Sequence, residues 1–166
     1  MTSIAIDRHD SLTEGAFRRI VATLFATDRS ALRTFLRITL GLVMIPHGLQ
    51  KTIGWFGGYG FEGTMGFFTS IGIPAFLGFL AIAAESAGAI ALVAGFTTRI
   101  AALGILANMV VAGVMHSANG FMMNWSGTQK GEGFEYHILA GAMALALVIG
   151  GAGRWSLDRV LANRIR

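Results

Sequence analysis

The sequence has no cysteine and only two prolines, and few of its residues are charged. The lack of cysteine excludes a disulfide framework, an iron–sulfur cluster ligated by this chain and a thiol nucleophile. Charged residues make up 13% of the chain, about half of the ~25% that is typical of soluble domains. Hydrophobic residues make up 54% of the 166 residues, which is more apolar surface than a soluble domain of this size could hide. We therefore expect lipid to surround much of the molecule.

Four apolar segments predict membrane helices, because a spanning helix needs about 20 mostly apolar residues. They cover residues 36–53, 74–96, 100–117 and 136–153. The first segment is the shortest, and its cations Arg37 and Lys51 are expected to point outward from its two ends to the headgroups. Pro46 should bend this helix, because proline lacks a backbone N–H. The sequence thus predicts an all-α, four-helix membrane bundle.

The positions of the basic residues predict the orientation of this bundle. All eleven arginines lie before or at the start of the first segment, in the short turn at Arg99, or after the fourth segment. The positive-inside rule therefore places both termini in the cytoplasm and both long loops outside. The pI near 10.3 then reflects topology and anionic lipid, and nucleic acid is not an expected partner. We also expect no cleaved signal peptide, because the first 30 residues contain charges and no apolar core.

The segment before the first span, residues 11–30, predicts an amphipathic helix. A capping box at its start and apolar residues at every fourth position support this: Ser11 with Glu14, then Leu12, Ala16, Ile20 and Leu24. We expect it to lie in the membrane interface, and a docking helix for a cytoplasmic partner is the alternative. The predicted organisation is an N-terminal helix over 1–34, a membrane domain over 35–158 and a basic tail over 159–166. The glycine- and aromatic-rich loop 52–73 is expected to fold back over the mouth of the bundle.

Glu85 is the most informative single residue, because it lies near the middle of the second apolar segment. A carboxylate at that depth costs about 2.5–3.5 kcal/mol on insertion scales. It must therefore face the bundle interior, either protonated or paired. The functional interpretation is an acid that handles a proton or grips a ligand, and the alternative is a buried hydrogen bond between helices.

Further polar residues gather at the outer ends of the other three segments. Spacings of three and four residues place side chains on one helix face, and the outer ends of the helices should meet. Beside Glu85 and His47 as the candidate catalytic residues, the expected ligand-binding residues are Gln50, Lys51, Asn108, His116, Asn119, Glu135, Tyr136 and His137. Each histidine alone could be an ordinary interfacial residue, but together with Glu85 they predict a polar pocket in the outer half.

A metal or haem is the less favoured content of this pocket. Three histidines and a carboxylate suit zinc or iron, but no H-E-x-x-H or E-x-x-H spacing is present. Glu135 and His137 are two residues apart on a helix and should point in different directions. We therefore assign no metal site. Haem ligated by His47 and either His116 or His137 stays open as an alternative.

Several stretches resemble the DoxX family of small bacterial integral membrane proteins. They are PHGLQKTIGWFGGYG, GFFTSIGIP, AAESAGAIALVAGFTTR, HSANGF and GFEYHILAG, within residues 36–158. The resemblance implies a four-helix, multi-pass protein of the bacterial inner membrane. Some members belong to a quinone-linked system for thiosulfate oxidation and others to an oxidative-stress membrane complex. The family motif residues correspond to His47, Gln50, Lys51, Glu85, Arg99, His116, Asn119, Glu135 and Tyr136.

The predicted function is therefore a membrane component of a redox system that binds a quinone-like or other small ligand in the polar pocket. His47 or His116 would hydrogen-bond a carbonyl oxygen, Glu85 would exchange a proton, and Lys51 or Gln50 would polarise the ligand. The absence of cysteine implies partner subunits for electron transfer. The alternative is a non-catalytic accessory or assembly subunit. A transporter is disfavoured, because no repeats or paired broken helices are visible.

Overall fold

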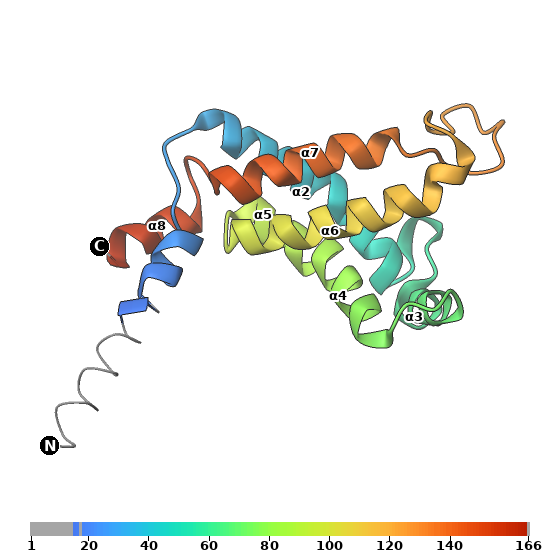
Figure 1. Cartoon of the computed structure of the whole chain (residues 1–166), viewed down its shortest axis with the longest axis horizontal. Coiled ribbons are helices and arrows are strands. Elements are labelled where there is room, and N and C mark those ends of the chain that lie inside the picture. The colour runs from blue at the N-terminus through green and yellow to red at the C-terminus, as the bar shows by residue number, and fades with distance from the viewer. Residues whose placement is uncertain (1–14, 17, 166) are drawn as a thin grey trace, which may run out of the picture.

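The computed structural model describes residues 15–165 except residue 17, and every regular element in this part of the chain is helical (Figure 1). This confirms the all-helical prediction. The elements are α2 (Ala31–Thr52), η1 (Trp55–Gly57), α3 (Gly60–Ser70), α4 (Ala75–Glu85), α5 (Ala87–Ala94), α6 (Thr98–His116), η2 (Ser117–Asn119), α7 (Glu135–Gly150) and α8 (Leu157–Ile165). Residues 18–24 are also helical, whereas the predicted capping box of Ser11 and Glu14 lies outside the described residues.

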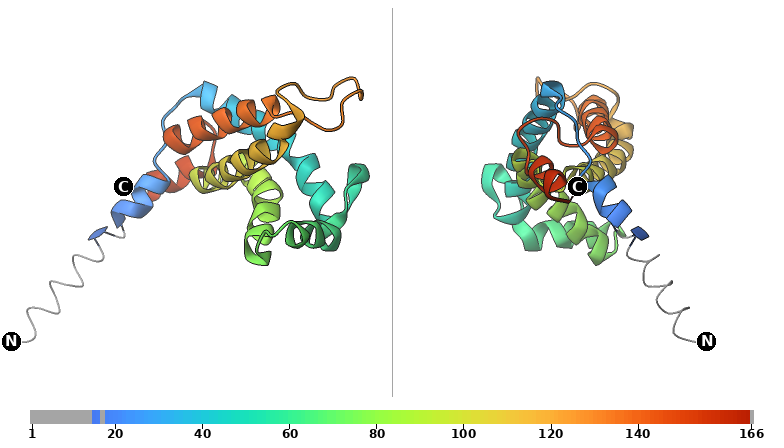
Figure 2. Two further views of the ribbon diagram at one scale, coloured as in Figure 1. Left: turned by 45° about the vertical axis from the view of Figure 1, so that its right-hand side comes forward. Right: turned by 90° about the vertical axis from the view of Figure 1, so that its left-hand side faces the viewer.

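The long helices pack in a ring around one core. Helix α2 contacts α4, α5 and α7, and α6 contacts the same three helices from the other side (Figures 1 and 2). The centre is filled mostly by small and aliphatic side chains with no exposed surface: Ala89, Leu92, Ala102, Ile105, Ala144 and Leu147. Small side chains let helix backbones approach closely, which is how membrane helices pack without a hydrophobic force between them.

The second apolar segment is not one continuous helix, as the sequence predicted, but two. Helix α4 ends at Glu85 and α5 begins at Ala87. Between them Ser86 has φ −100° and ψ −77°, whereas an ideal helix has ψ near −42°. The Ser86 hydroxyl donates to the carbonyl of Ile82 at 2.7 Å, a bond that is known to bend helices. As a result α4 runs at an angle to α5 (Figure 2).

Arg37 is buried, so the prediction that its side chain points outward to the headgroups was wrong. It is only 1% exposed, and its guanidinium donates to the carbonyls of Leu92, Val93, Ala152 and Trp155. The first two carbonyls belong to the last turn of α5, where helix carbonyls have no partner within the helix and a cation is favoured. Arg37 therefore fastens α2 to the end of α5 and to the segment that follows α7.

Two other charged residues fasten helix ends in the same part of the molecule. The buried Asp158 carboxylate accepts from the backbone N–H groups of Thr97 at 2.6 Å and Thr98 at 2.9 Å, so that it caps the start of α6. Arg99 donates to the carbonyls of Val148 and Ile149 at the end of α7. This end of the bundle, where α2 and α6 begin and α5 and α7 end, is held by charged side chains bonded to backbone.

The two long connections lie at the opposite end of the bundle. The connection over 52–73 contains the short helix η1 and the helix α3, which packs on α2 and α4. Most of its aromatic side chains are exposed, with Tyr59 at 80%. The second connection, after η2, is irregular as far as α7.

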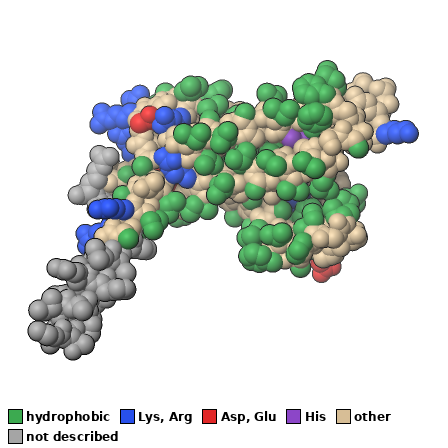
Figure 3. Space-filling model, viewed as in Figure 1, with side chains coloured by type: hydrophobic (Ala, Val, Ile, Leu, Met, Phe, Trp, Pro, Cys, Tyr) green, Lys and Arg blue, Asp and Glu red, His purple; other side chains and the backbone are tan. Residues whose placement is uncertain are grey.

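The outer faces of the helices are apolar. Figure 3 shows hydrophobic side chains along the flank of the bundle and a cluster of Arg and Lys side chains near the chain ends. Two described stretches are long and apolar enough to cross a membrane, Ala75–Ala94 and Thr98–Asn119, while Glu135–Gly150 is apolar but shorter. Exposed side chains on these stretches include Phe76 at 69% and Val114 at 70%. Such surfaces suit contact with lipid.

Candidate functional site

A buried ion pair lies where α2, α4 and α6 meet. Lys51, in the last turn of α2, pairs through Nζ with Oε2 of Glu85. Glu85 is 6% exposed, and its Oε1 also faces Asn108 Nδ2 at 3.3 Å. Asn108 donates in addition to the Ala81 carbonyl at 2.8 Å. The prediction that Lys51 points outward to the headgroups was wrong, because its ammonium pairs with the Glu85 carboxylate.

The helix break brings the backbone of α4 against α2 at this site. A Cβ atom added to Gly48 would lie 2.7 Å from Cα of Ser86 and would also overlap the Glu85 carbonyl oxygen. Only a glycine allows this approach. The close contact brings Lys51, one turn beyond Gly48, within reach of Glu85.

Four aromatic rings continue the site from α2 across α7 to α6. The ring centroids of His47 and Tyr136 are 5.9 Å apart, and those of Tyr136 and His137 are 5.7 Å apart. His137 stacks on His116 at 4.9 Å with an interplanar angle of 20°. His47 lies one turn before Lys51 on the same face of α2. The ion pair and the rings therefore form one polar region.

Two polar atoms in this region have no hydrogen-bond partner in the described chain. They are the Tyr136 hydroxyl oxygen and Nδ1 of His137, and both are buried. A buried polar group without a partner costs about 1–3 kcal/mol, so native proteins keep few of them and those few often serve a function. His116 differs, because its Nδ1 lies 2.8 Å from the carbonyl oxygen of Ala112. The two unpartnered atoms mark where a polar ligand could bind.

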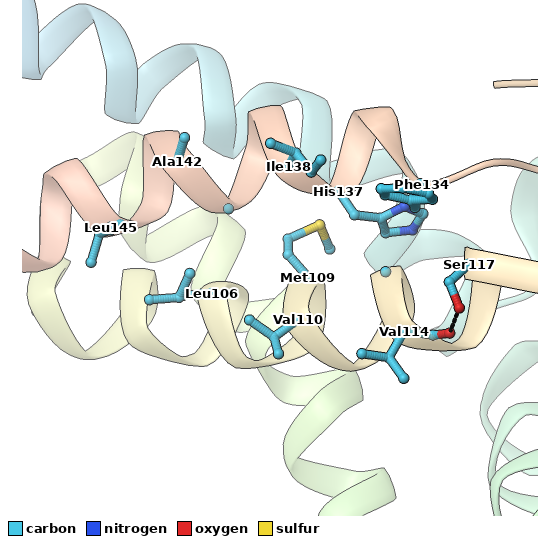
Figure 4. Close-up of a pocket in the computed structure, with 12 residues that line it drawn as sticks. Leu106, Met109, Val110, Val114, Ser117, Phe134, His137, Ile138, Ala142 and Leu145 are labelled. Atoms are coloured by element: carbon cyan, nitrogen blue, oxygen red, sulfur yellow. Dashed lines mark hydrogen bonds between the residues drawn. The ribbon is translucent and has the colours of Figure 1, made fainter. Parts of the chain in front are cut away.

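An apolar groove of about 450 Å³ runs between α6 and α7 and reaches one of these rings, that of His137. Figure 4 shows Leu106 and Leu145 toward one end of the groove and His137 with Phe134 toward the other. Exposed side chains such as Val110 and Ile138 line it, so the groove opens on the outer face of the bundle. His137 thus belongs both to the groove and to the polar region.

The structure brings together most of the predicted site residues: His47, Lys51, Glu85, Asn108, His116, Tyr136 and His137. The polar groups of the other three bond to loops. Gln50 donates to the Phe56 carbonyl, and Asn119 donates to the Glu132 carbonyl. Glu135 accepts from the backbone of Met123 and the indole of Trp125. Their role in ligand binding stays a prediction.

Sequence reasoning missed the break at Ser86 and the use of Lys51 as the partner of Glu85. The signal for the first was a serine next to an intramembrane acid, and for the second a lone lysine at the end of a short helix. No group of three or more His, Asp or Glu side chains that could hold a metal ion occurs among the described residues.

The comparisons with known proteins identify one family. The family model DoxX matches residues 32–118, more than half of the chain. The matched region runs from α2 to η2 and contains His47, Lys51, Glu85 and Asn108, whereas Tyr136 and His137 follow it. Searches of curated proteins and of solved structures found no match. Because the family model covers more than half of it and its helices are apolar enough to cross a membrane, this chain is a membrane protein and belongs to the DoxX family.

Proposed function

We propose that this protein is a multi-pass subunit of a redox system in the bacterial inner membrane and binds a quinone-like ligand beside the Lys51–Glu85 pair. The observation that carries the proposal is the buried ion pair next to two unpartnered polar atoms, on Tyr136 and His137. Membership of the DoxX family supports it, because that family is associated with redox systems. A carbonyl oxygen of the ligand accepts a hydrogen bond from the Tyr136 hydroxyl, and His47 lies beside it.

The α6–α7 groove accommodates the apolar tail of such a ligand. Isoprenoid tails are as apolar as the side chains of this groove, and His137 at its end offers a polar atom to the headgroup. Reduction of a quinone to a quinol takes two electrons and two protons. Glu85 passes protons to the ligand, and Lys51 balances its charge when the carboxylate is ionised. The electrons come from a partner subunit, because a chain without cysteine has neither a thiol pair nor cluster ligands of that kind.

Ligand binding can be tested with photoreactive azidoquinones on purified protein in lipid nanodiscs. We expect the label on α2 near His47 and on the first turn of α7, and at least ten-fold less label in Glu85→Gln and in His47→Ala. Glu62→Gln is the matched control, because Glu62 is an exposed acid on α3. No specific label, or equal label in Glu85→Gln and the wild type, would overturn the proposal. A fall in thermal stability alone would favour the alternative, an accessory subunit in which the pair only joins helices.

The proposed topology has four spans, formed by α2, by α4 with α5, by α6 and by α7, with both termini in the cytoplasm. The arginines near the chain ends support this orientation. The domain limits at 34 and 158 belong to the same proposal, with 1–34 lying on the membrane surface.

The topology predicts which introduced cysteines a membrane-impermeant maleimide can reach in intact cells. The natural chain has no cysteine, so each variant carries a single reactive thiol. Thr128→Cys, in the connection before α7, should be labelled from outside, and Asn163→Cys, on α8, should be labelled only after lysis. Both positions are exposed. The reverse pattern would overturn the orientation, and external labelling of both would overturn the even number of spans.

A further inference from the structure

We propose a second binding site, independent of the quinone proposal, that holds the phosphate of an anionic phospholipid at the end of the bundle where the charged side chains cap the helices. The site is a hollow of about 500 Å³ between the residues before α2 and the start of α8. We call it the basic hollow; its lining includes Arg29, Arg154, Trp155, Leu157, Arg159 and Val160.

The charges of the basic hollow suit an anion. Its three arginines come from two distant stretches of the chain, and none of the described residues that line it is acidic. The two acids nearest in sequence to these arginines bind other groups. Asp28 pairs with Arg33 at 2.9 Å, and the buried Asp158 accepts from the N–H groups at the start of α6. Arginine guanidinium groups bind phosphate oxygens with two parallel hydrogen bonds.

The position and the apolar rim of the hollow point to a lipid and not to free phosphate. Ala94, the last residue of α5, also lines it, so it lies where an apolar helix ends and headgroups begin. Trp155 is 70% exposed, and the guanidinium of Arg154 lies 4.6 Å from the centroid of its ring. Tryptophan is typical of this depth in a bilayer. Leu157 and Val160 are 49% and 51% exposed and offer surface to acyl chains.

Helix α8 combines the same two properties, basic charge and exposed apolar surface. It carries Arg159 on a chain segment that also exposes Leu157 and Val160. A short helix of this kind lies in the plane of the interface, where its basic residues are attracted to an anionic surface. Figure 3 shows this gathering of basic side chains beside hydrophobic ones near the chain ends.

Native mass spectrometry of the detergent-purified protein tests the site. With phosphatidylglycerol and phosphatidylcholine added in equal amounts, we expect at least a ten-fold preference for phosphatidylglycerol. The preference should vanish in Arg154→Gln/Arg159→Gln and persist in Lys130→Gln/Arg164→Gln, which removes the same charge from exposed positions outside the hollow. Equal loss in both double variants, or no preference in the wild type, would overturn the proposal. If millimolar inorganic phosphate displaced the lipid, the site would be one for free phosphate, and the proposal of a lipid site would be overturned.

A second measurement leaves the arginines intact. The chain has three tryptophans, and Trp55→Phe/Trp125→Phe leaves Trp155 as the only tryptophan, whose fluorescence can be excited selectively. In nanodiscs, brominated phosphatidylglycerol should quench Trp155 at least twice as strongly as brominated phosphatidylcholine at the same mole fraction. Equal quenching by the two lipids would show that Trp155 meets the bilayer without a bound anionic lipid, and would overturn the proposal.

Discussion

Glu85→Leu should lower the free energy of unfolding by about 3–5 kcal/mol, whereas Lys51→Met/Glu85→Leu should recover most of this loss. The single substitution leaves the Lys51 ammonium facing an apolar interior, and an uncompensated buried charge costs about that much. The double substitution removes both charges, and replacing a buried ion pair by apolar residues is often close to neutral. The Lys51 side chain is 26% exposed, so it can turn partly outward and the cost should lie toward the lower limit.

Unfolding of the purified variants in detergent micelles, followed by circular dichroism, gives the two free energies. Glu62→Leu is the control, because it removes an exposed acid and should change the stability by less than about 0.5 kcal/mol. If the double variant is as unstable as Glu85→Leu, the pair does not determine the stability of this region. The same double variant also separates the two proposed functions: a stable protein that no longer binds azidoquinone indicates a ligand site.

Arg37→Met should destabilise the protein by about 3–5 kcal/mol, because it leaves buried carbonyls without donors. The guanidinium donates to Leu92, Val93, Ala152 and Trp155 at distances between 2.5 and 3.0 Å. Arg37→Lys should recover less than half of the loss. A lysine keeps the charge. Its single ammonium, however, cannot reach all four carbonyls, because they lie on different sides of the planar guanidinium in the wild type.

Denaturant unfolding of the two variants tests this prediction, and Arg164→Met is the matched control, since Arg164 is exposed on α8. We expect the free energy of unfolding to decrease from the wild type to Arg37→Lys and further to Arg37→Met, and we expect the control to be as stable as the wild type. Equal stability of Arg37→Lys and the wild type would contradict the assignment, because charge alone would then account for the effect.

The sequence predicted the features that follow from the cost of polar groups in lipid. Glu85 was expected inside the bundle because a carboxylate near mid-membrane needs a partner, and it is 6% exposed. Tyr136 and His137 were expected at the start of a helix near other polar groups, and both lie in the ring series with His47. Periodicity and polarity are local properties, so a sequence displays them directly.

What the sequence could not predict depends on residues that are distant along the chain. Lys51 was assigned to the headgroups because its partner is 34 positions away in another helix. Arg37 was assigned in the same way, since two of its acceptors are more than 100 positions away. Ser86 interrupts a run that periodicity alone makes continuous, and the backbone of Gly48 packs against that interruption. Each of these outcomes is decided by packing between helices.

The acceptors of Arg37 also set an order in which the protein can mature. A growing chain that ends near residue 100 already holds the carbonyls of Leu92 and Val93, but those of Ala152 and Trp155 do not yet exist. Asp158, which caps α6, is synthesised later still. The first two apolar segments and the start of α6 therefore wait in the membrane with an arginine that is only half satisfied and a helix start without its cap. Completion of the fold belongs to the last steps of synthesis, when the segment after α7 closes this end of the bundle.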